Sequence, residues 1–242
     1  MPATATPPTY VQFPSDKLTL GAGVAIFHLA TSRVIVCYHT RDKYYFLPKG
    51  RKNANESLER AAEREGFEES GYRNRLLPVV MKHRATEAEE FSTECQWMQL
   101  LPLTTTAQYV LFWFVAETLP GDVEDAYAVE ASSGEGGGER VYRPPPGFPK
   151  NVTFKQRIAQ DTMTGSTVDG KPEIYEPRWH EGTAQDEEEM CYRSYLMPVD
   201  EARRVLKGSV MEDVVRRGWE GIRARMKIED EREKGKGMSR GG

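Results

Sequence analysis

One segment, residues 57–70, constrains the fold more than any other. Its sequence, SLERAAEREGFEES, predicts a helix that begins after Ser57 and ends at Gly71, because serine caps helix N-termini and glycine follows C-termini. Acidic residues stand at positions i, i+3 and i+4 of one helical face: Glu65, Glu68 and Glu69. Like charges at this spacing repel, and the helix dipole disfavours acids near the C-terminal end. We therefore expect a compensating cation, and Mg²⁺ and Mn²⁺ prefer carboxylate ligands.

A basic stretch precedes this helix. Between positions 33 and 52, six residues are lysine or arginine and one is aspartate. A metal-binding carboxylate cluster beside a basic loop is the pairing that phosphoanhydride chemistry requires. The metal neutralises phosphate oxygens, and the basic side chains hold the remaining charge.

Residues 50–72 resemble the Nudix box, G-x5-E-x7-R-E-U-x-E-E-x-G-U, in which U is a bulky apolar residue. Seven specified residues stand at the family's spacing, and a tyrosine occupies the last apolar position. They are Gly50, Glu56, Arg64, Glu65, Glu68, Glu69 and Gly71, followed by Tyr72. One position differs from the Nudix box pattern, because Gly66 stands where the family has an aliphatic residue. Glycine inside a helix costs about 1 kcal/mol relative to alanine, and we expect the neighbouring Phe67 to refill the space.

The resemblance implies a role for each matched residue. Glu65, Glu68 and Glu69 would bind Mg²⁺ or Mn²⁺ together with the carbonyl of Gly50. A structural ion pair would hold the loop against the helix, between Glu56 and Arg64.

The catalytic residues implied by the resemblance are Glu68 and Glu69, and Glu68 is our choice of general base. In this family an acid from another loop can also take that role. The acidic run at 186–189 is therefore an alternative base or an additional ligand, although a solvated acidic loop is the simpler interpretation of such a run.

The box entry also bears on the substrate. Residues 47–50, LPKG, resemble the entry in Nudix enzymes that act on diadenosine polyphosphates and diphosphoinositol polyphosphates. The likeness implies that Lys49 contacts a substrate phosphate, with Arg51, Lys52 and Arg41 as further candidates. Other substrates remain open: a nucleotide sugar, an oxidised nucleotide or an RNA cap. A non-catalytic nucleotide-binding or regulatory module is the alternative from another class, and the intact glutamates argue against it.

Hydrophobic patterning predicts an α+β chain. We expect strands at 20–29, 34–38, 44–47, 76–81, 109–117 and 192–198, and helices at 200–206 and from 209 onward. The resemblance implies an α/β/α sandwich with a mixed central sheet. The final helix carries a Ser209–Glu212 capping-box spacing and an apolar stripe that we expect to pack on the sheet. Trp179, near a candidate substrate loop, is a candidate for stacking on a nucleobase.

We expect the chain to be organised around a single domain. This Nudix domain would cover 17–226, after a flexible arm at 1–16. A low-complexity insertion is expected at about 122–170 because of its glycine and proline runs, and a disordered tail at 227–242.

The composition limits the classes of molecule that we expect this protein to bind. Lys and Arg number 33 against 37 Asp and Glu, a net charge of −4, which disfavours nucleic-acid binding other than to capped RNA. We expect a small phosphorylated substrate and no membrane contact, because the longest apolar run falls far short of the ~20 residues of a spanning helix. We see no secretory leader and expect a cytoplasmic protein, with the nucleus as a second option. The oligomeric state stays open.

Overall fold

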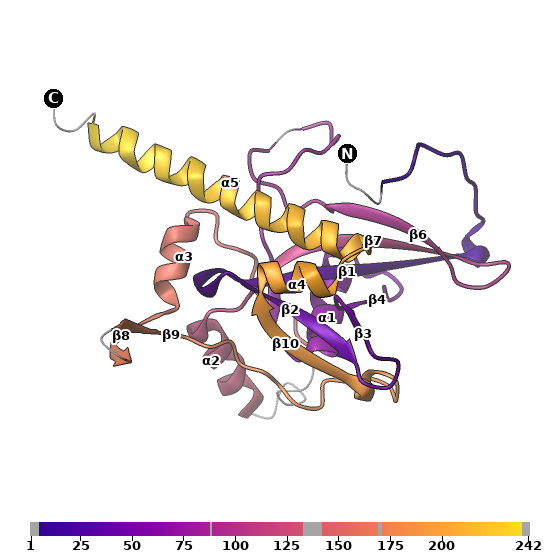
Figure 1. Cartoon of the computed structure of the whole chain (residues 1–242), viewed down its shortest axis with the longest axis horizontal. Helices are drawn as coiled ribbons and strands as arrows, with labels where there is room; N and C mark the ends of the chain where they lie inside the picture. Colours follow the sequence, from indigo (N-terminus) through magenta and orange to yellow (C-terminus); the bar gives the residue numbers. More distant parts are fainter. Residues whose placement is uncertain (1–4, 88, 133–141, 169–170, 239–242) are drawn as a thin grey trace.

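An eight-stranded sheet forms the centre of the molecule in the computed structural model, which describes residues 5–87, 89–132, 142–168 and 171–238 (Figure 1). Its strands are β1 (Leu18–His28), β2 (Arg33–His39), β3 (Tyr44–Phe46), β4 (Lys49–Arg51), β5 (Asn74–Leu76), β6 (Trp97–Pro102), β7 (Gln108–Thr118) and β10 (Tyr192–Pro198). The order is β10-β2-β1-β7-β5, while β3 pairs with β2, β4 with β1 and β6 with β7. The sheet is mixed because β1 and β7 are parallel and the other pairs are antiparallel.

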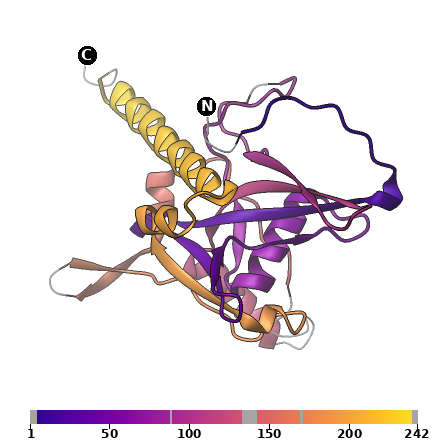
Figure 2. The same ribbon diagram turned by 45° about the vertical axis from the view of Figure 1, so that its right-hand side comes forward.

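Helices cover both faces of this sheet (Figures 1 and 2). One face carries α1 (Leu58–Ser70), and the other carries α4 (Val199–Val205) and α5 (Val210–Met238). Successive residues of β1 point to opposite faces, so Val24 and Ile26 lie in the core under α1, whereas Ala25 and Phe27 lie in the core under α5. The predicted α/β/α sandwich with a mixed sheet is therefore confirmed.

The helix α1 has the predicted boundaries. The Oγ of Ser57 accepts a hydrogen bond from the backbone N–H of Arg60 at 3.2 Å. Gly71 adopts φ 76°, in the left-handed region, and its N–H donates to the carbonyl of Phe67 at 2.8 Å. Local capping chemistry thus fixes both ends of the helix that carries the box glutamates.

Gly66 packs closely against residues of the sheet. A Cβ at this position would stand 2.6 Å from Nδ2 of Asn74 and 2.9 Å from Cγ1 of Val24. The expectation that Phe67 refills the space is wrong, because the Asn74 amide occupies it and donates to the carbonyl of Glu63 at 3.0 Å. The phenyl ring of Phe67 instead contacts the guanidinium of Arg73, 4.4 Å from its centroid.

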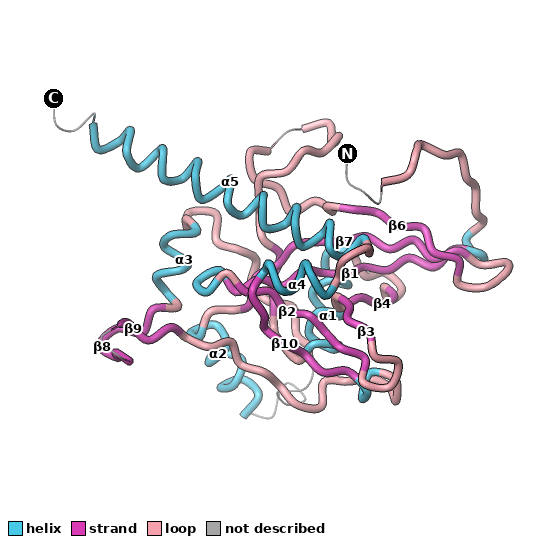
Figure 3. The backbone as a smooth tube through the Cα atoms, in the orientation of Figure 1, coloured by secondary structure: helices cyan, strands magenta, loops and turns pink. Residues whose placement is uncertain are grey.

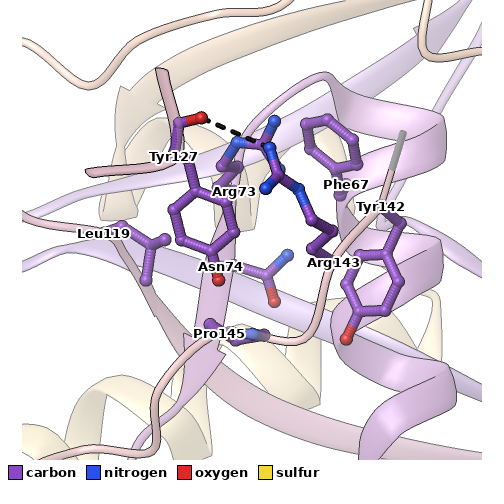
Figure 4. Close-up of a pocket in the computed structure, with 8 residues that line it drawn as sticks. All are labelled: Phe67, Arg73, Asn74, Leu119, Tyr127, Tyr142, Arg143 and Pro145. Carbon is purple, nitrogen blue, oxygen red and sulfur yellow. Dashed lines mark hydrogen bonds between the residues drawn. The ribbon is translucent and has the colours of Figure 1, made fainter. Parts of the chain in front are cut away.

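Figure 4 shows what covers this part of α1. The guanidinium of Arg73 lies between the rings of Phe67 and Tyr127, 4.4 and 4.6 Å from their centroids. The guanidinium of Arg143 donates to the carbonyl of Tyr127 at 3.3 Å, and the Tyr127 hydroxyl donates to the carbonyl of Pro144 at 2.9 Å. The cation–π contacts of Arg73 therefore link α1 to Tyr127, and hydrogen bonds hold the segment after position 142 against Tyr127.

The expected low-complexity insertion at 122–170 contains regular secondary structure in its described part. The described part contains α2 (Gly121–Ser132), α3 (Phe154–Gln160) and β8 (Thr162–Val168), which pairs with β9 (Lys171–Ile174) in a separate hairpin (Figure 3). Arg157 of α3 is buried and forms ion pairs with Glu117 and Asp161, both at 2.7 Å. Sequence composition missed α3 because its fixing contacts come from the end of β7. Residues 133–141 and 169–170 of the expected insertion lie outside the described residues.

The predicted strand at 76–81 is also corrected. The strand is β5, ending at Leu76, and Val79 makes only an isolated bridge with Ser92. Pro78 interrupts the strand, because proline has no N–H to donate. The strands β4 and β6 were not anticipated, whereas β10 has the predicted bounds of 192–198.

The chain's two ends differ from each other. Residues 5–14 carry no helix or strand, and residues 1–4 lie outside the described part. The disordered tail expected at 227–242 is wrong through Met238, because α5 continues to that residue and projects away from the sheet (Figure 2). Glu229 helps to hold the helix, since its carboxylate accepts hydrogen bonds from Arg225 and from the N–H of Phe154, both at 2.7 Å. Residues 239–242 lie outside the described part.

The predicted apolar stripe of α5 does pack on the sheet. Val214, Val215 and Ile222 are fully buried in the core under this helix. The predicted capping box does not form, because the Ser209 hydroxyl donates to the carbonyl of Leu206 and the Glu212 carboxylate accepts from Arg203. Among the described residues, none of the helices combines the length and apolar character that crossing a membrane requires.

Candidate active site

Three carboxylates from distant parts of the chain meet at the C-terminal half of α1. Glu65 and Glu69 come from the helix, and Glu189 comes from the short turn that precedes β10. Each contributes one oxygen, and these oxygens lie within 4.8 Å of one another. The two helix residues are nearly buried, 6% and 9% exposed. A divalent cation fits this group, because hard cations prefer clustered carboxylate oxygens.

Burial raises the pKa of each carboxyl in this group. The pKa of Glu65 rises to about 7, chiefly by burial, although the neighbouring Arg64 opposes the shift. The pKa of Glu69 rises to about 8 through burial and through repulsion from Glu65 and Glu189, against the attraction of Lys49. Burial also raises the pKa of Glu189. Ionising all three groups near neutral pH therefore requires additional positive charge, which a bound cation supplies.

The short turn around residues 185–191 aims Glu189 at the helix. The Oδ1 of Asp186 accepts hydrogen bonds from the N–H groups of Glu188 and Glu189, both at 2.9 Å. The Glu189 carboxylate itself accepts from the N–H of Gln185 at 2.6 Å. Among the four acids at 186–189, all of which the structure describes, Glu189 joins the carboxylate group and Asp186 shapes the turn. Glu189 is thus the one candidate from residues 186–189 for an additional acid at the site.

Arg64 links the loop to the helix. Its guanidinium donates to Glu56, Glu65 and Glu68 at 2.7 to 3.0 Å, and to the carbonyl of Arg51 at 2.8 Å. Although burial opposes it, hydrogen bonding to Arg64 and to a backbone N–H lowers the pKa of Glu56. The expected Glu56–Arg64 pair is present in the geometry, in the structural position that the resemblance implied.

Glu68 lies apart from the three-carboxylate group. Its carboxylate accepts from Arg64 at 2.7 Å, and Glu68 lines the cavity described below. Burial raises its pKa, against the attraction of Arg64. Its expected roles as ligand and general base stay predictions.

Gly50 lies directly against Glu65. A Cβ at this position would stand 2.0 Å from Oε2 of Glu65, so only glycine allows this approach. The Gly50 carbonyl accepts a hydrogen bond from the hydroxyl of Tyr109 at 2.9 Å. Tyr109 belongs to β7, 59 residues away, and sequence reasoning did not single it out. Its only sequence signal was a place in an apolar strand.

The four expected phosphate-binding cations differ in their surroundings. The backbone of Lys49 lies beside the carboxylates, since its N–H donates to Oε2 of Glu69 at 2.7 Å. The charge of Lys49 opposes the rise in the Glu69 pKa. Arg51 uses its carbonyl to hold Arg64. Lys52 donates to the carbonyl of the adjacent Asn53, and Arg41 pairs with its neighbour Asp42 at 3.6 Å. The structure therefore brings Lys49 to the carboxylates and gives Lys52 and Arg41 local partners.

A cavity of about 210 Å³ opens beside the carboxylates. One part of its wall is acidic and comes from Glu68, Glu69 and Glu189. Other lining residues include Trp179, Met190 and Arg193. The cavity therefore combines potential metal ligands, an aromatic ring and a cation.

Comparison with known protein families assigns part of the chain to a family. The NUDIX domain model matches residues 18–135, from β1 into the segment after α2. Residues 18–135 form a Nudix domain. Nudix enzymes in general use divalent ions such as Mg²⁺, in agreement with the carboxylate group.

Solved structures of Nudix hydrolases also resemble this chain. A NUDIX hydrolase from Nitrosomonas europaea is 14% identical, with a TM-score of 0.31, and the match covers 43% of this chain and 60% of that one. The Ap4A hydrolase of C. elegans is 10% identical, with a TM-score of 0.41, over 83% and 95% of the two chains. A NUDIX hydrolase from Clostridium perfringens is 12% identical, with a TM-score of 0.38, over 85% and 97%. The NUDIX domain model over residues 18–135 carries the family assignment.

Proposed function

We propose that this protein is a metal-dependent hydrolase of a phosphoanhydride bond in a polyphosphorylated small molecule. The observation that carries the proposal is the meeting of Glu65, Glu69 and Glu189 within 4.8 Å. Burial raises the pKa of each carboxyl, so ionising all three near neutral pH requires added positive charge, and a divalent cation would supply it. The charge of Lys49 acts on Glu69, and we expect this cation to contact the same substrate.

The proposed ligands are the three carboxylates and the carbonyl of Gly50, which lies against Glu65. When bound, Mg²⁺ or Mn²⁺ would supply positive charge that offsets the charge developing on the phosphate oxygens. Tyr109 keeps the Gly50 carbonyl in place by donating to it. Arg64 holds the loop and the helix at a fixed spacing through Glu56.

We propose Glu68 as the general base of the reaction. Its carboxylate lines the cavity and is oriented by Arg64. It accepts a proton from a water molecule whose oxygen attacks phosphorus, and the bond from that phosphorus to the bridging oxygen breaks. The leaving phosphate retains the bridging oxygen, while Lys49 binds phosphate oxygens and holds their charge.

The substrate that we propose is a dinucleoside polyphosphate or a diphosphoinositol polyphosphate. The support for this is the LPKG entry to the box and the position of Lys49 beside the carboxylates. A nucleotide sugar, an oxidised nucleotide and capped RNA are the runner-up substrates. A non-catalytic nucleotide-binding module is the alternative from another class, and turnover separates it from the enzyme.

The test measures the release of phosphorylated products, such as nucleotides, sugar phosphates or inorganic phosphate, from each of these substrates with Mg²⁺, with Mn²⁺ and with EDTA. We expect metal-dependent release from one substrate class. Glu69→Gln should abolish that release while the protein stays folded, because the exchange removes a charge at nearly constant volume. Glu59→Gln is the matched control, since Glu59 is an exposed residue of the same helix.

Two results would contradict the proposal. Wild-type rates in Glu69→Gln would exclude the carboxylate group as the metal site. A folded wild-type protein that binds Mg²⁺ but releases nothing from any substrate would favour the non-catalytic module.

A further inference from the structure

Trp179 presents a large aromatic surface to solvent beside the carboxylates. Its side chain is 49% exposed, although tryptophan is one of the residues with most to gain from burial. It also lines the cavity that contains Glu68, Glu69 and Glu189. An exposed indole in the wall of such a cavity is a surface on which a ligand can stack.

The backbone around Trp179 is held firmly against α1. Trp179 forms an antiparallel bridge with Tyr72, and the next residue, His180, donates its N–H to the carbonyl of Gly71 at 2.8 Å. One edge of the indole lies on Gly71, where a Cβ would stand 2.6 Å from Nε1. The indole therefore has a defined position, so a ligand that stacks on it does not have to order a mobile loop first.

Two further residues that line the cavity, Met190 and Arg193, add a thioether and a positive charge. Met190 is 67% exposed, lines the same cavity and directly follows Glu189. Its flexible thioether makes favourable contacts with aromatic rings. Arg193, also in the cavity wall, adds a positive charge that suits phosphate. A ligand with a flat aromatic ring and attached phosphates matches all three side chains.

The two substrate classes that we propose, dinucleoside polyphosphates and diphosphoinositol polyphosphates, differ in whether they offer an aromatic ring. A nucleobase has a planar π-face that stacks on indole, and such stacking is sequence-tolerant because every base has this face. An inositol ring is saturated and carries a polar group on each carbon, so it offers no π-face. The exposed indole and thioether therefore discriminate between the two classes.

We propose that Trp179 is a specificity-determining residue that stacks on a nucleobase, and that the substrate is a nucleoside polyphosphate. This inference rests on the proposed hydrolase function and selects among its substrates. Met190 packs beside the stacked base, and Arg193 binds phosphate in the same cavity.

The experiment compares hydrolysis of diadenosine tetraphosphate with hydrolysis of a diphosphoinositol pentakisphosphate. We expect diadenosine tetraphosphate to be the better substrate of the wild-type enzyme. Trp179→Ala should raise its KM about tenfold or more with little change in kcat, because stacking contributes about 1–3 kcal/mol per base and 1.4 kcal/mol is a factor of ten. Trp179→Phe, which retains a ring, should rescue most of the loss. Tyr195→Ala is the matched control, since Tyr195 is an aromatic residue of similar exposure, 46%, on β10.

A binding measurement gives a readout that does not depend on turnover. AMP should quench the fluorescence of the wild-type protein in EDTA, ribose 5-phosphate should not, and Trp179→Phe should remove the quenching. Circular dichroism of each variant establishes that it is folded.

The possible failures are distinguishable. If the wild-type protein hydrolyses no substrate, the proposed function itself fails. If it hydrolyses diadenosine tetraphosphate with a KM that Trp179→Ala leaves unchanged, the function stands and the stacking role is refuted. Preferred hydrolysis of the diphosphoinositol, with no quenching by AMP, likewise overturns the assignment to nucleoside polyphosphates.

Discussion

Replacing Gly66 with alanine should destabilise the protein, although alanine is the better helix former. In an exposed helix the exchange would gain about 1 kcal/mol. Here the new Cβ would stand 2.6 Å from Nδ2 of Asn74 and 2.9 Å from Cγ1 of Val24, both shorter than real Cβ contacts. The helix or the Asn74 side chain must therefore move.

The expected loss in the free energy of unfolding follows from the groups that must move. Overpacking of a core costs about 1–3 kcal/mol. Displacing the Asn74 amide also breaks its 3.0 Å hydrogen bond to the carbonyl of Glu63, which costs about 1 kcal/mol. Subtracting the propensity gain leaves a net loss of about 1–3 kcal/mol. For a chain of this size each kcal/mol lowers Tm by about 2–4 °C.

The assay is thermal or urea unfolding of Gly66→Ala beside a control and a rescue variant. Gly235→Ala is the control, because Gly235 is also in a helix and a Cβ there meets nothing within 4 Å. It should leave stability unchanged or raise it slightly. The rescue variant adds Asn74→Ala to Gly66→Ala, and it should lose less stability than the sum of the two single changes.

Two results would refute this reasoning. A rise in Tm for Gly66→Ala like that of the control would show that helix propensity outweighs the steric contact. Strict additivity in the double variant would show that Asn74 is not the residue that excludes a side chain at this position.

The remaining predictions concern the carboxylate group. Glu189→Gln should weaken Mg²⁺ binding at least tenfold in calorimetric titration, whereas Glu59→Gln should not; equal affinities would remove Glu189 from the site. Because the pKa values of Glu65 and Glu69 are raised to about 7 and 8, the folded metal-free protein favours their protonated forms. Its Tm should therefore fall as pH rises from about 5 to above 8, and Mg²⁺ should raise Tm more at pH 8.5 than at pH 5.5; an equal rise at both would contradict this. Tyr109→Phe removes the 2.9 Å hydrogen bond to the Gly50 carbonyl and should cost about 1 kcal/mol in urea unfolding, and an unchanged midpoint would show that the bond contributes nothing.

Local features of the site were predictable from the sequence. The ends of α1 follow from Ser57 and Gly71, because capping depends on the few residues next to each helix end. The shared face of Glu65 and Glu69 follows from helical spacing, and the Glu56–Arg64 pair forms as the resemblance implied. Strand β10 was also predictable, because its tyrosines favour strands and a proline stands at its end.

Other features needed contacts between distant segments. The segment at 122–170 has the composition of a low-complexity insertion, yet α3 is fixed by ion pairs from Arg157 to Glu117 and Asp161. Composition measures only the average hydrophobicity of a segment, and a buried charge becomes favourable only beside its partners. The role of Gly66 was misjudged for the same reason, because the Asn74 side chain that excludes a Cβ comes from the next strand.

The sequence by itself determined a carboxylate-bearing helix, the loop that precedes it and therefore the class of chemistry. Only the tertiary structure decided which residues complete the site. Antiparallel pairing of β10 with β2 places Tyr192 opposite His39, which brings the preceding Glu189 to α1 across more than 100 residues of chain. Sheet pairing likewise brings Tyr109 to Gly50, and a bridge to Tyr72 brings Trp179 to the helix end. Helical spacing is a local property of the chain, whereas these meetings depend on strand order and register, which local residue patterns do not encode.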